Sequence, residues 1–267
     1  MDVRGDKDIT GKSFYPALEH SLGARGLSLE KLCAPDDAVA RRVLEEYGAM
    51  FMVGSRVRVP PVCIFSSEAE VAEFQREAGF ARYDFEAAAI ELQPAALDAL
   101  LAARDEAQAS GLEISPRGGA EAARRGYADT LRLWNTRVLP ALDYWREHGR
   151  LSIEQIEHLR ALPVREQVAA VLQWEAQEIF FSKDFSKTIL QSVAAPGASQ
   201  HLSMLAFDVA EFRDAAVRRI LARHGWFQTV RSDLPHFTFL DLREEELPAH
   251  GLRRVEDEAQ IFWTPDL

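Results

Sequence analysis

The stretch from residue 199 to residue 208 reads Ser-Gln-His-Leu-Ser-Met-Leu-Ala-Phe-Asp. Its second half is apolar, which predicts a buried strand that ends at Asp208. A carboxylate in such surroundings is costly to bury unless a cation or a metal ion pairs with it. His201 begins this stretch, and His236 opens a second apolar strand. Two imidazoles and one carboxylate are the ligand set of a zinc site that keeps a fourth position for water, although hydrogen-bonded core residues would show the same pattern.

Longer periodicities surround this stretch and predict helices. Apolar residues recur every three or four positions over residues 94–111, 123–145 and 211–224. Pro140 is expected to kink or break the second helix, because proline lacks the N–H group that a helix uses. Short strands are expected near residue 90 and over residues 112–115, 202–209, 236–242 and 261–263. Short strands among long helices, without regular βαβ spacing, favour an α+β fold in which helices flank a small antiparallel sheet.

The N-terminal third predicts a mostly helical extension. Residues 16–48 contain two helical stretches, and a later helix is expected to stop at Gly79. Residues 50–65 are rich in β-branched side chains, but a pair of prolines restricts them to an edge or irregular strand. We therefore expect an N-terminal extension over residues 1–84, which would cover one side of a cleft, and a second domain over residues 85–267.

Composition excludes several classes of protein. The chain has 267 residues, of which 47% are hydrophobic and 27% charged, as in a folded globular protein. With 31 basic and 42 acidic residues its net charge is −11, so no nucleic-acid partner bound through a broad basic surface is expected. The sequence contains no run of 18 apolar residues, and we expect no membrane span. It also contains neither a glycine-rich nucleotide-binding motif nor the GxSxG motif of serine hydrolases.

The quoted stretch resembles the SxHxxGxAxD motif of the zinc D-alanyl-D-alanine carboxypeptidases, the VanY-like family. The family's second motif, ExWH followed by a strand, is similar to residues 233–237, Asp-Leu-Pro-His-Phe. Residues 114–117, Ile-Ser-Pro-Arg, resemble the strand and arginine of the family's SGYRS segment. The resemblance covers residues 85–242 and implies a hedgehog/DD-peptidase-like fold.

That resemblance implies a metal centre and a mechanism. His201, Asp208 and His236 would bind one Zn²⁺ ion per chain, and Asp233 would stand in the place of the family's catalytic glutamate. Zinc lowers the pKa of bound water and polarises a carbonyl group, while a nearby carboxylate moves the proton. The implied activity is a zinc metallopeptidase that hydrolyses peptide bonds.

Two further residues are expected to contact the substrate. Arg117 corresponds to the family's arginine near the substrate carboxylate, and a guanidinium group presents a planar fork to such a group. Ser199 either hydrogen-bonds the substrate or stabilises its own turn. The implied partner is a peptidoglycan stem peptide, cut at its C-terminal D-alanine or, by an endopeptidase of the same fold, at an L-alanyl-D-glutamate bond. Such an enzyme works in the periplasm or at the cell surface, whereas residues 1–12 are polar and resemble no signal peptide, so this location implies a removed leader.

Departures from the family pattern keep two other interpretations open. Met204 stands where the motif has glycine and could narrow the site, and Pro235 replaces the tryptophan before the last ligand. Asp233 is one methylene shorter than glutamate, and small displacements of a catalytic group lower rates strongly. One alternative is therefore a non-catalytic, zinc-containing protein that binds cell-wall peptides. Another is a purely structural metal, closed by His224 as a fourth ligand.

Four more residues have roles that the sequence leaves open. Glu175 and Glu178 lie on one predicted helix and could supply a replacement base, although a solvated helix face is the default for such residues. Cys33 and Cys63 are expected to be buried thiols or, in an exported protein, a single disulfide.

Overall fold

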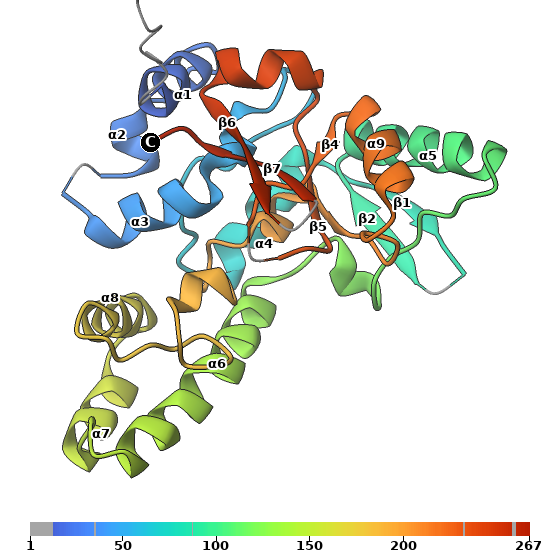
Figure 1. Cartoon of the computed structure of the whole chain (residues 1–267). Coiled ribbons are helices and arrows are strands. Elements are labelled where there is room, and N and C mark those ends of the chain that lie inside the picture. The colour runs from blue at the N-terminus through green and yellow to red at the C-terminus, as the bar shows by residue number, and fades with distance from the viewer. Residues whose placement is uncertain (1–12, 35, 87, 232, 258–259) are drawn as a thin grey trace, which may run out of the picture.

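The computed structural model describes residues 13–34, 36–86, 88–231, 233–257 and 260–267, and it combines helices with small antiparallel sheets (Figure 1). The expected α+β class is confirmed at this level. Residues 1–12 of the predicted N-terminal extension lie outside the described residues. None of the helices in the described part of the chain has the length and apolar character needed to cross a lipid bilayer.

The elements of the described residues follow in chain order. The α-helices are α1 (Phe14–Gly23), α2 (Leu29–Leu32), α3 (Ala38–Tyr47), α4 (Glu68–Ala78), α5 (Pro94–Ala109), α6 (Tyr127–Glu147), α7 (Ile153–Ala161), α8 (Val164–Glu175) and α9 (Ala215–Arg223). The 3-10 helices are η1 (Gly48–Met52), η2 (Ala120–Ala122), η3 (Ile189–Gln191), η4 (Gln200–Ser203) and η5 (Glu244–His250). The strands are β1 (Ala81–Asp84), β2 (Ala89–Leu92), β3 (Ala206–Asp208), β4 (Trp226–Phe227), β5 (His236–Phe239), β6 (Leu252–Asp257) and β7 (Gln260–Pro265).

The central sheet has the strand order β3-β5-β4 and is antiparallel throughout. Because side chains alternate between the faces of a strand, Phe207 and Phe237 point to one face and enter the main hydrophobic core. Asp208 and its cross-strand partner His236 lie on the other face. β1 and β2 form one hairpin, and β6 and β7 form another.

The main core unites the two ends of the chain. Phe14 of α1 is fully buried in the same cluster as Leu252 and Trp263 near the C-terminus. A Cβ atom on Gly48 would come within 2.6 Å of the Phe14 ring, and one on Gly251 within 2.8 Å of its Cα atom, so both glycines permit this close packing. Side chains from before and after residue 84 therefore share one core, while the predicted boundary itself stays a prediction.

Helices α6, α7 and α8 form an arm that projects from the rest of the molecule (Figure 1). The arm has its own cluster of buried side chains, which includes Trp134 and Phe181 and reaches Tyr47 of α3. Pro140 does not break the helix, because α6 runs through it, and the expected kink stays a prediction. Pro140 and Thr136 both lie on the exposed side of α6, where water can bind the carbonyl oxygen that proline leaves without a donor.

Three expected strands are corrected by local hydrogen bonds. Residues 50–65 form η1 and a loop, because the Arg25 guanidinium binds the carbonyl oxygens of Val53, Gly54 and Val57 in place of a neighbouring strand. Residues 112–115 form no strand, and only the single bridge between Pro116 and Val209 follows them.

The third correction concerns the quoted stretch itself. Its strand begins at Ala206, because η4 occupies the four residues from Gln200 and ends at Met204. Met204 adopts a left-handed conformation, φ 58° and ψ 30°, which turns the chain into β3. Cys33 and Cys63, in the N-terminal part of the main core, are buried free thiols.

We expect Phe14→Ala to lower the free energy of unfolding by about 3–5 kcal/mol, because the cavity lies where the two chain ends meet. Urea denaturation measures this change. Ile153→Ala is the matched control: Ile153 is 59% exposed, and its loss should change stability by less than about 0.5 kcal/mol. Equal stability of the two variants would contradict a core shared by both ends.

Candidate metal centre

The structure brings His201, Asp208 and His236 together. His201 Nε2 lies 3.1 Å from His236 Nδ1, and Asp208 Oδ1 lies 3.3 Å from each of these two nitrogens. Both histidines are buried, and the Asp208 side chain is 14% exposed. The three atoms form a nearly equilateral triangle, and this group could hold a metal ion.

The register of the central sheet sets this geometry. Asp208 ends β3 directly opposite His236, which begins β5, so their side chains are cross-strand neighbours on one face. His201 comes from η4, and the left-handed turn at Met204 folds η4 back against β3. The sequence predicted these residues at strand ends. The pairing of β3 with β5 brings Asp208 and His236 into contact, and η4 adds His201.

The triangle fits a small tetrahedral ion. Ligand atoms at the usual zinc distances of about 2.0–2.1 Å stand about 3.3–3.4 Å apart in a tetrahedron. In addition, Asp208 Oδ1 is buried and accepts no hydrogen bond within the described part of the chain. A buried carboxylate oxygen without a donor is unfavourable unless a cation neutralises it.

Neighbouring groups orient each ligand. His201 Nδ1 lies 2.7 Å from the Ala123 carbonyl oxygen, and His236 Nε2 lies 2.8 Å from Gln200 Oε1. Because a carbonyl oxygen can only accept, His201 carries its proton on Nδ1 and His236 carries its proton on Nε2. The lone pairs of His201 Nε2 and His236 Nδ1 then face each other and the Asp208 oxygen. Three facing lone pairs repel one another, and a bound cation would turn this repulsion into attraction. Hydrogen-bonded partners of this kind are typical of metal-binding histidines.

Gln200 is itself held in a fixed orientation. Its Nε2 donates to the Tyr47 carbonyl oxygen at 2.9 Å, so Oε1 must face His236. The hydroxyls of Thr229 and Thr238 also donate to this oxygen. Helix α3 of the N-terminal part thereby helps to position a ligand that lies nearly two hundred residues later.

Arg125 holds the second oxygen of Asp208. One of its terminal nitrogens donates to Asp208 Oδ2 at 2.7 Å, and its Nε donates to the Glu121 carbonyl oxygen. Our sequence interpretation missed Arg125. It precedes α6 by two residues, and a cation is unfavourable at a helix N-terminus, which is the signal that could have found it.

The charge states suit a cation site. Burial, with the nearby Arg125 charge, lowers the pKa of His201 to about 4, so the ring is neutral at pH 7 and its lone pair is available. The ion pair with Arg125, at 2.7 Å, favours the charged form of Asp208. The centre therefore presents the negative charge of Asp208 beside the neutral ring of His201.

The two histidines of the triad border a cavity of about 690 Å³, which Ser199 and Asp233 also line. Asp233 is exposed to this cavity, and its backbone carbonyl accepts from the His236 N–H. Partial desolvation by the surrounding protein raises the pKa of Asp233, against the opposing effect of His236. Asp233 is not part of the ligand group itself. The predicted base and the two histidine ligands thus share one cavity.

Arg117 lies apart from them. Its side chain is exposed, stacks on the Phe212 ring at 5.1 Å and is not among the residues that line the cavity. Its backbone N–H donates to the Asp208 carbonyl oxygen at 2.8 Å. The predicted contact between Arg117 and a substrate carboxylate stays a prediction, whereas the Arg125 side chain lines the cavity. Met204, expected to narrow the site, is buried outside the cavity lining.

His224 and Glu175 have other partners. His224 Nε2 lies 2.8 Å from a Glu106 oxygen, and His224 is not part of the ligand group in the described chain. Glu175 is buried rather than solvated: its carboxylate accepts from the N–H groups of Phe181 and Ile189 and from the Thr188 hydroxyl. Glu175 therefore fixes the loop that follows α8, and Glu178 is exposed.

A scan against protein-family models found no match for the chain, and a search of curated proteins found none either.

We expect Gln200→Leu to weaken metal binding by about 10–100-fold, because His236 loses the acceptor that orients its ring. Competition with a chromophoric chelator measures this affinity. The control Gln260→Leu removes another buried amide, which bonds Gln228 in the C-terminal hairpin, and should leave metal affinity unchanged. Undiminished affinity in a folded Gln200→Leu protein would refute this role of Gln200.

A second variant tests the buried carboxylate. Glu175→Gln replaces an acceptor oxygen by an amide donor that faces backbone N–H groups, and we expect a loss of about 1–3 kcal/mol in the free energy of unfolding. Glu178→Gln, at an exposed position on the same segment, should cost less than about 0.5 kcal/mol. A Glu175→Gln protein as stable as Glu178→Gln would show that the carboxylate does not hold the loop.

Proposed function

We propose that this protein is a zinc-dependent peptidase that hydrolyses peptidoglycan peptides in the manner of D-alanyl-D-alanine carboxypeptidases. The observation that supports it is the triangle of His201, Asp208 and His236, whose two histidines line the same cavity as the non-ligating carboxylate of Asp233. Three protein ligands and a vacant direction toward a cavity are the arrangement of catalytic rather than structural zinc sites. The proposal includes a DD-peptidase-like fold for residues 85–267 and a place of action outside the cytoplasmic membrane.

The chain's own residues divide the chemistry among them. When bound, zinc would polarise the scissile carbonyl and acidify a water molecule. Asp233 would accept the proton of the attacking water and deliver it to the leaving amine. Arg125 would keep Asp208 ionised and oriented, and Arg125 also lines the cavity that would receive the peptide.

Which peptide bond is cut depends on the substrate groups that the cavity accommodates on either side of that bond. A carboxypeptidase must accommodate a free C-terminal carboxylate, and an L-alanyl-D-glutamate endopeptidase must accommodate chain on both sides of the bond. Both reactions use the same water and the same base, so peptides of both types belong in the assay.

The first experiment measures metal content and hydrolysis together. We expect about one zinc ion per wild-type chain, its loss in His201→Ala and His236→Ala, and its retention in His224→Ala, whose ring pairs with Glu106. We also expect wild-type protein to release D-alanine from peptides that end in D-Ala-D-Ala. Asp233→Asn should keep the metal and lower kcat by about 10²–10⁴-fold.

Each alternative has its own result. A protein that takes up no metal overturns the peptidase proposal. A protein that holds zinc and binds these peptides, but hydrolyses none at any concentration, is the non-catalytic binding protein instead. In that case Asp233→Glu, which restores the missing methylene, tests whether the shorter side chain is the reason.

A further inference from the structure

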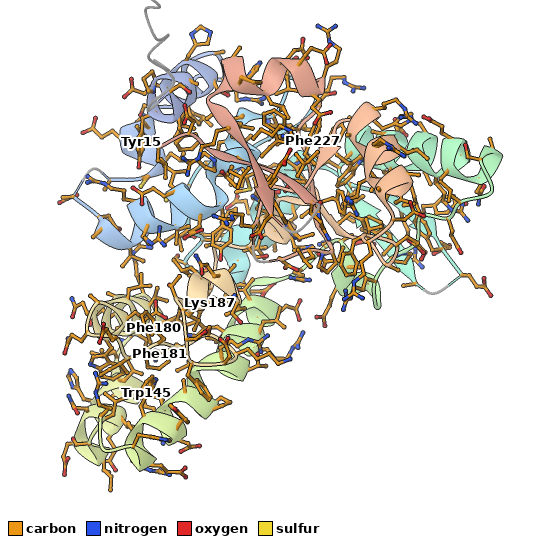
Figure 2. All side chains as sticks on the ribbon, in the orientation of Figure 1. Tyr15, Trp145, Phe180, Phe181, Lys187 and Phe227 are labelled. Atoms are coloured by element: carbon orange, nitrogen blue, oxygen red, sulfur yellow. The ribbon has the colours of Figure 1, made fainter. Side chains whose placement is uncertain are left out.

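The arm supplies a wall of the same cavity, and this wall is cationic. Lys183 and Lys187 lie on the loop between α8 and η3, and Arg137 lies on α6; all three line the cavity that His201 and His236 also line. Figure 2 shows Lys187 where the arm meets the rest of the molecule. Because the whole chain has a net charge of −11, a local excess of cations in this cavity requires an explanation.

These cations have no carboxylate partner among the described residues. Arg137 donates to the hydroxyls of Ser192 and Thr136, and no ion pair is formed by Lys183 or Lys187 in the described chain. Asp184, the neighbouring acid, instead accepts from the Ser182 hydroxyl. Three positive charges therefore remain available to an anion that enters the cavity.

The loop that presents the lysines is rigidly built. Ser182 Oγ accepts from the backbone N–H groups of Ser186 and Lys187, each at 3.1 Å. Phe185 stacks on Tyr144 of α6 with ring centroids 4.3 Å apart. Glu175 binds the backbone on either side of the loop. A preformed loop loses less conformational entropy when a ligand binds than a free one would.

The charges of the cavity differ from one side to the other. On the metal side, Asp208 is paired with Arg125, and Asp233 adds a negative charge that repels anions. On the arm side, only the hydrogen-bonded Asp184 accompanies the three cations. A peptide with a carboxylate at one end of the bound segment would be drawn into one orientation. A cavity of about 690 Å³ has room for such a segment, since pockets of about 300–1,000 Å³ hold drug-sized ligands.

We propose that Arg137, Lys183 and Lys187 form an anion subsite, which binds a side-chain carboxylate of the peptide whose scissile bond lies at the metal triad. The substrate class is therefore an acidic peptide. This inference rests on the proposed function for the identity of the peptide, but the subsite binds through charges that lie outside the metal centre.

Paired peptides test the subsite by calorimetric binding. The probes are acetyl-Xaa-Gly-D-Ala-D-Ala and acetyl-Xaa-Gly-Gly-D-Ala-D-Ala, in which Xaa is glutamate or glutamine, so that two distances from the metal are sampled. We expect the glutamate form of at least one length to bind about tenfold more tightly than its glutamine form in 50 mM salt, and the difference to shrink in 500 mM salt.

Substitutions test whether Lys183 and Lys187 cause the preference for the glutamate peptide. Lys183→Gln and Lys187→Gln should each weaken binding of the glutamate peptide about threefold, and the double variant should bind both peptides equally. Binding of the glutamine peptide should not change. Arg160→Gln, an exposed cation on α7 outside the cavity lining, is the matched control and should keep the full preference.

The outcomes separate this proposal from the proposed function. Equal affinity for the two forms in wild-type protein, or no binding of either, overturns the subsite even when zinc is bound and D-alanine is released. A glutamate preference that survives Lys183→Gln/Lys187→Gln overturns it as well. A further outcome would overturn only the peptidase: wild-type protein holds no metal and hydrolyses no peptide. The subsite is still supported in that case if the glutamate preference is lost in the double variant and persists in His201→Ala.

Discussion

The antiparallel pairing of β3 with β5 is the constraint on which the candidate site depends. Its register sets Asp208 opposite His236 on one face and Phe207 opposite Phe237 on the other. A shift of one residue would exchange the faces, placing the carboxylate in the apolar core and a phenyl ring beside the histidine. The burial of the two aromatic side chains therefore stabilises the same register that assembles the ligands.

The polar centre is supported by parts of the chain that are distant in sequence. Tyr47 at the end of α3 orients Gln200, which orients His236, and the Ala123 carbonyl oxygen before α6 orients His201. Burying such groups is favourable only when each has a partner, and the exception is Asp208 Oδ1. Among the described side-chain atoms of this centre, the unsatisfied Asp208 Oδ1 is therefore the place where a cation would bind under the proposed function.

The arm and the loop that follows it contribute cationic side chains to the cavity, although they supply none of the three candidate metal ligands. Helix α6 leaves the body beside Arg125, and α8 ends at Glu175, whose carboxylate fixes the following loop. That loop returns the chain to η4 and on the way presents Lys183 and Lys187 to the cavity. The segment that carries these lysines therefore leads along the chain directly into the segment that carries His201.

Much of this protein could be predicted from its sequence, because local patterns determine local structure. The helices α4, α5 and α9 and the hydrophobic character of β3 and β5 all follow from periodicity and from residues that end helices. The ligand triad was also visible, since a lone aspartate in an apolar strand is costly to bury in any fold.

Tertiary structure decided the features that depend on contacts between distant segments. Arg25 satisfies the backbone of residues 53–57 and prevents a strand there, the Arg125 side chain pairs with Asp208, and Glu175 becomes a buried support for its loop. A local pattern can single out such a residue, as the helix N-terminus does for Arg125, but it does not specify the partner, because only the folded chain brings the two groups within hydrogen-bonding distance.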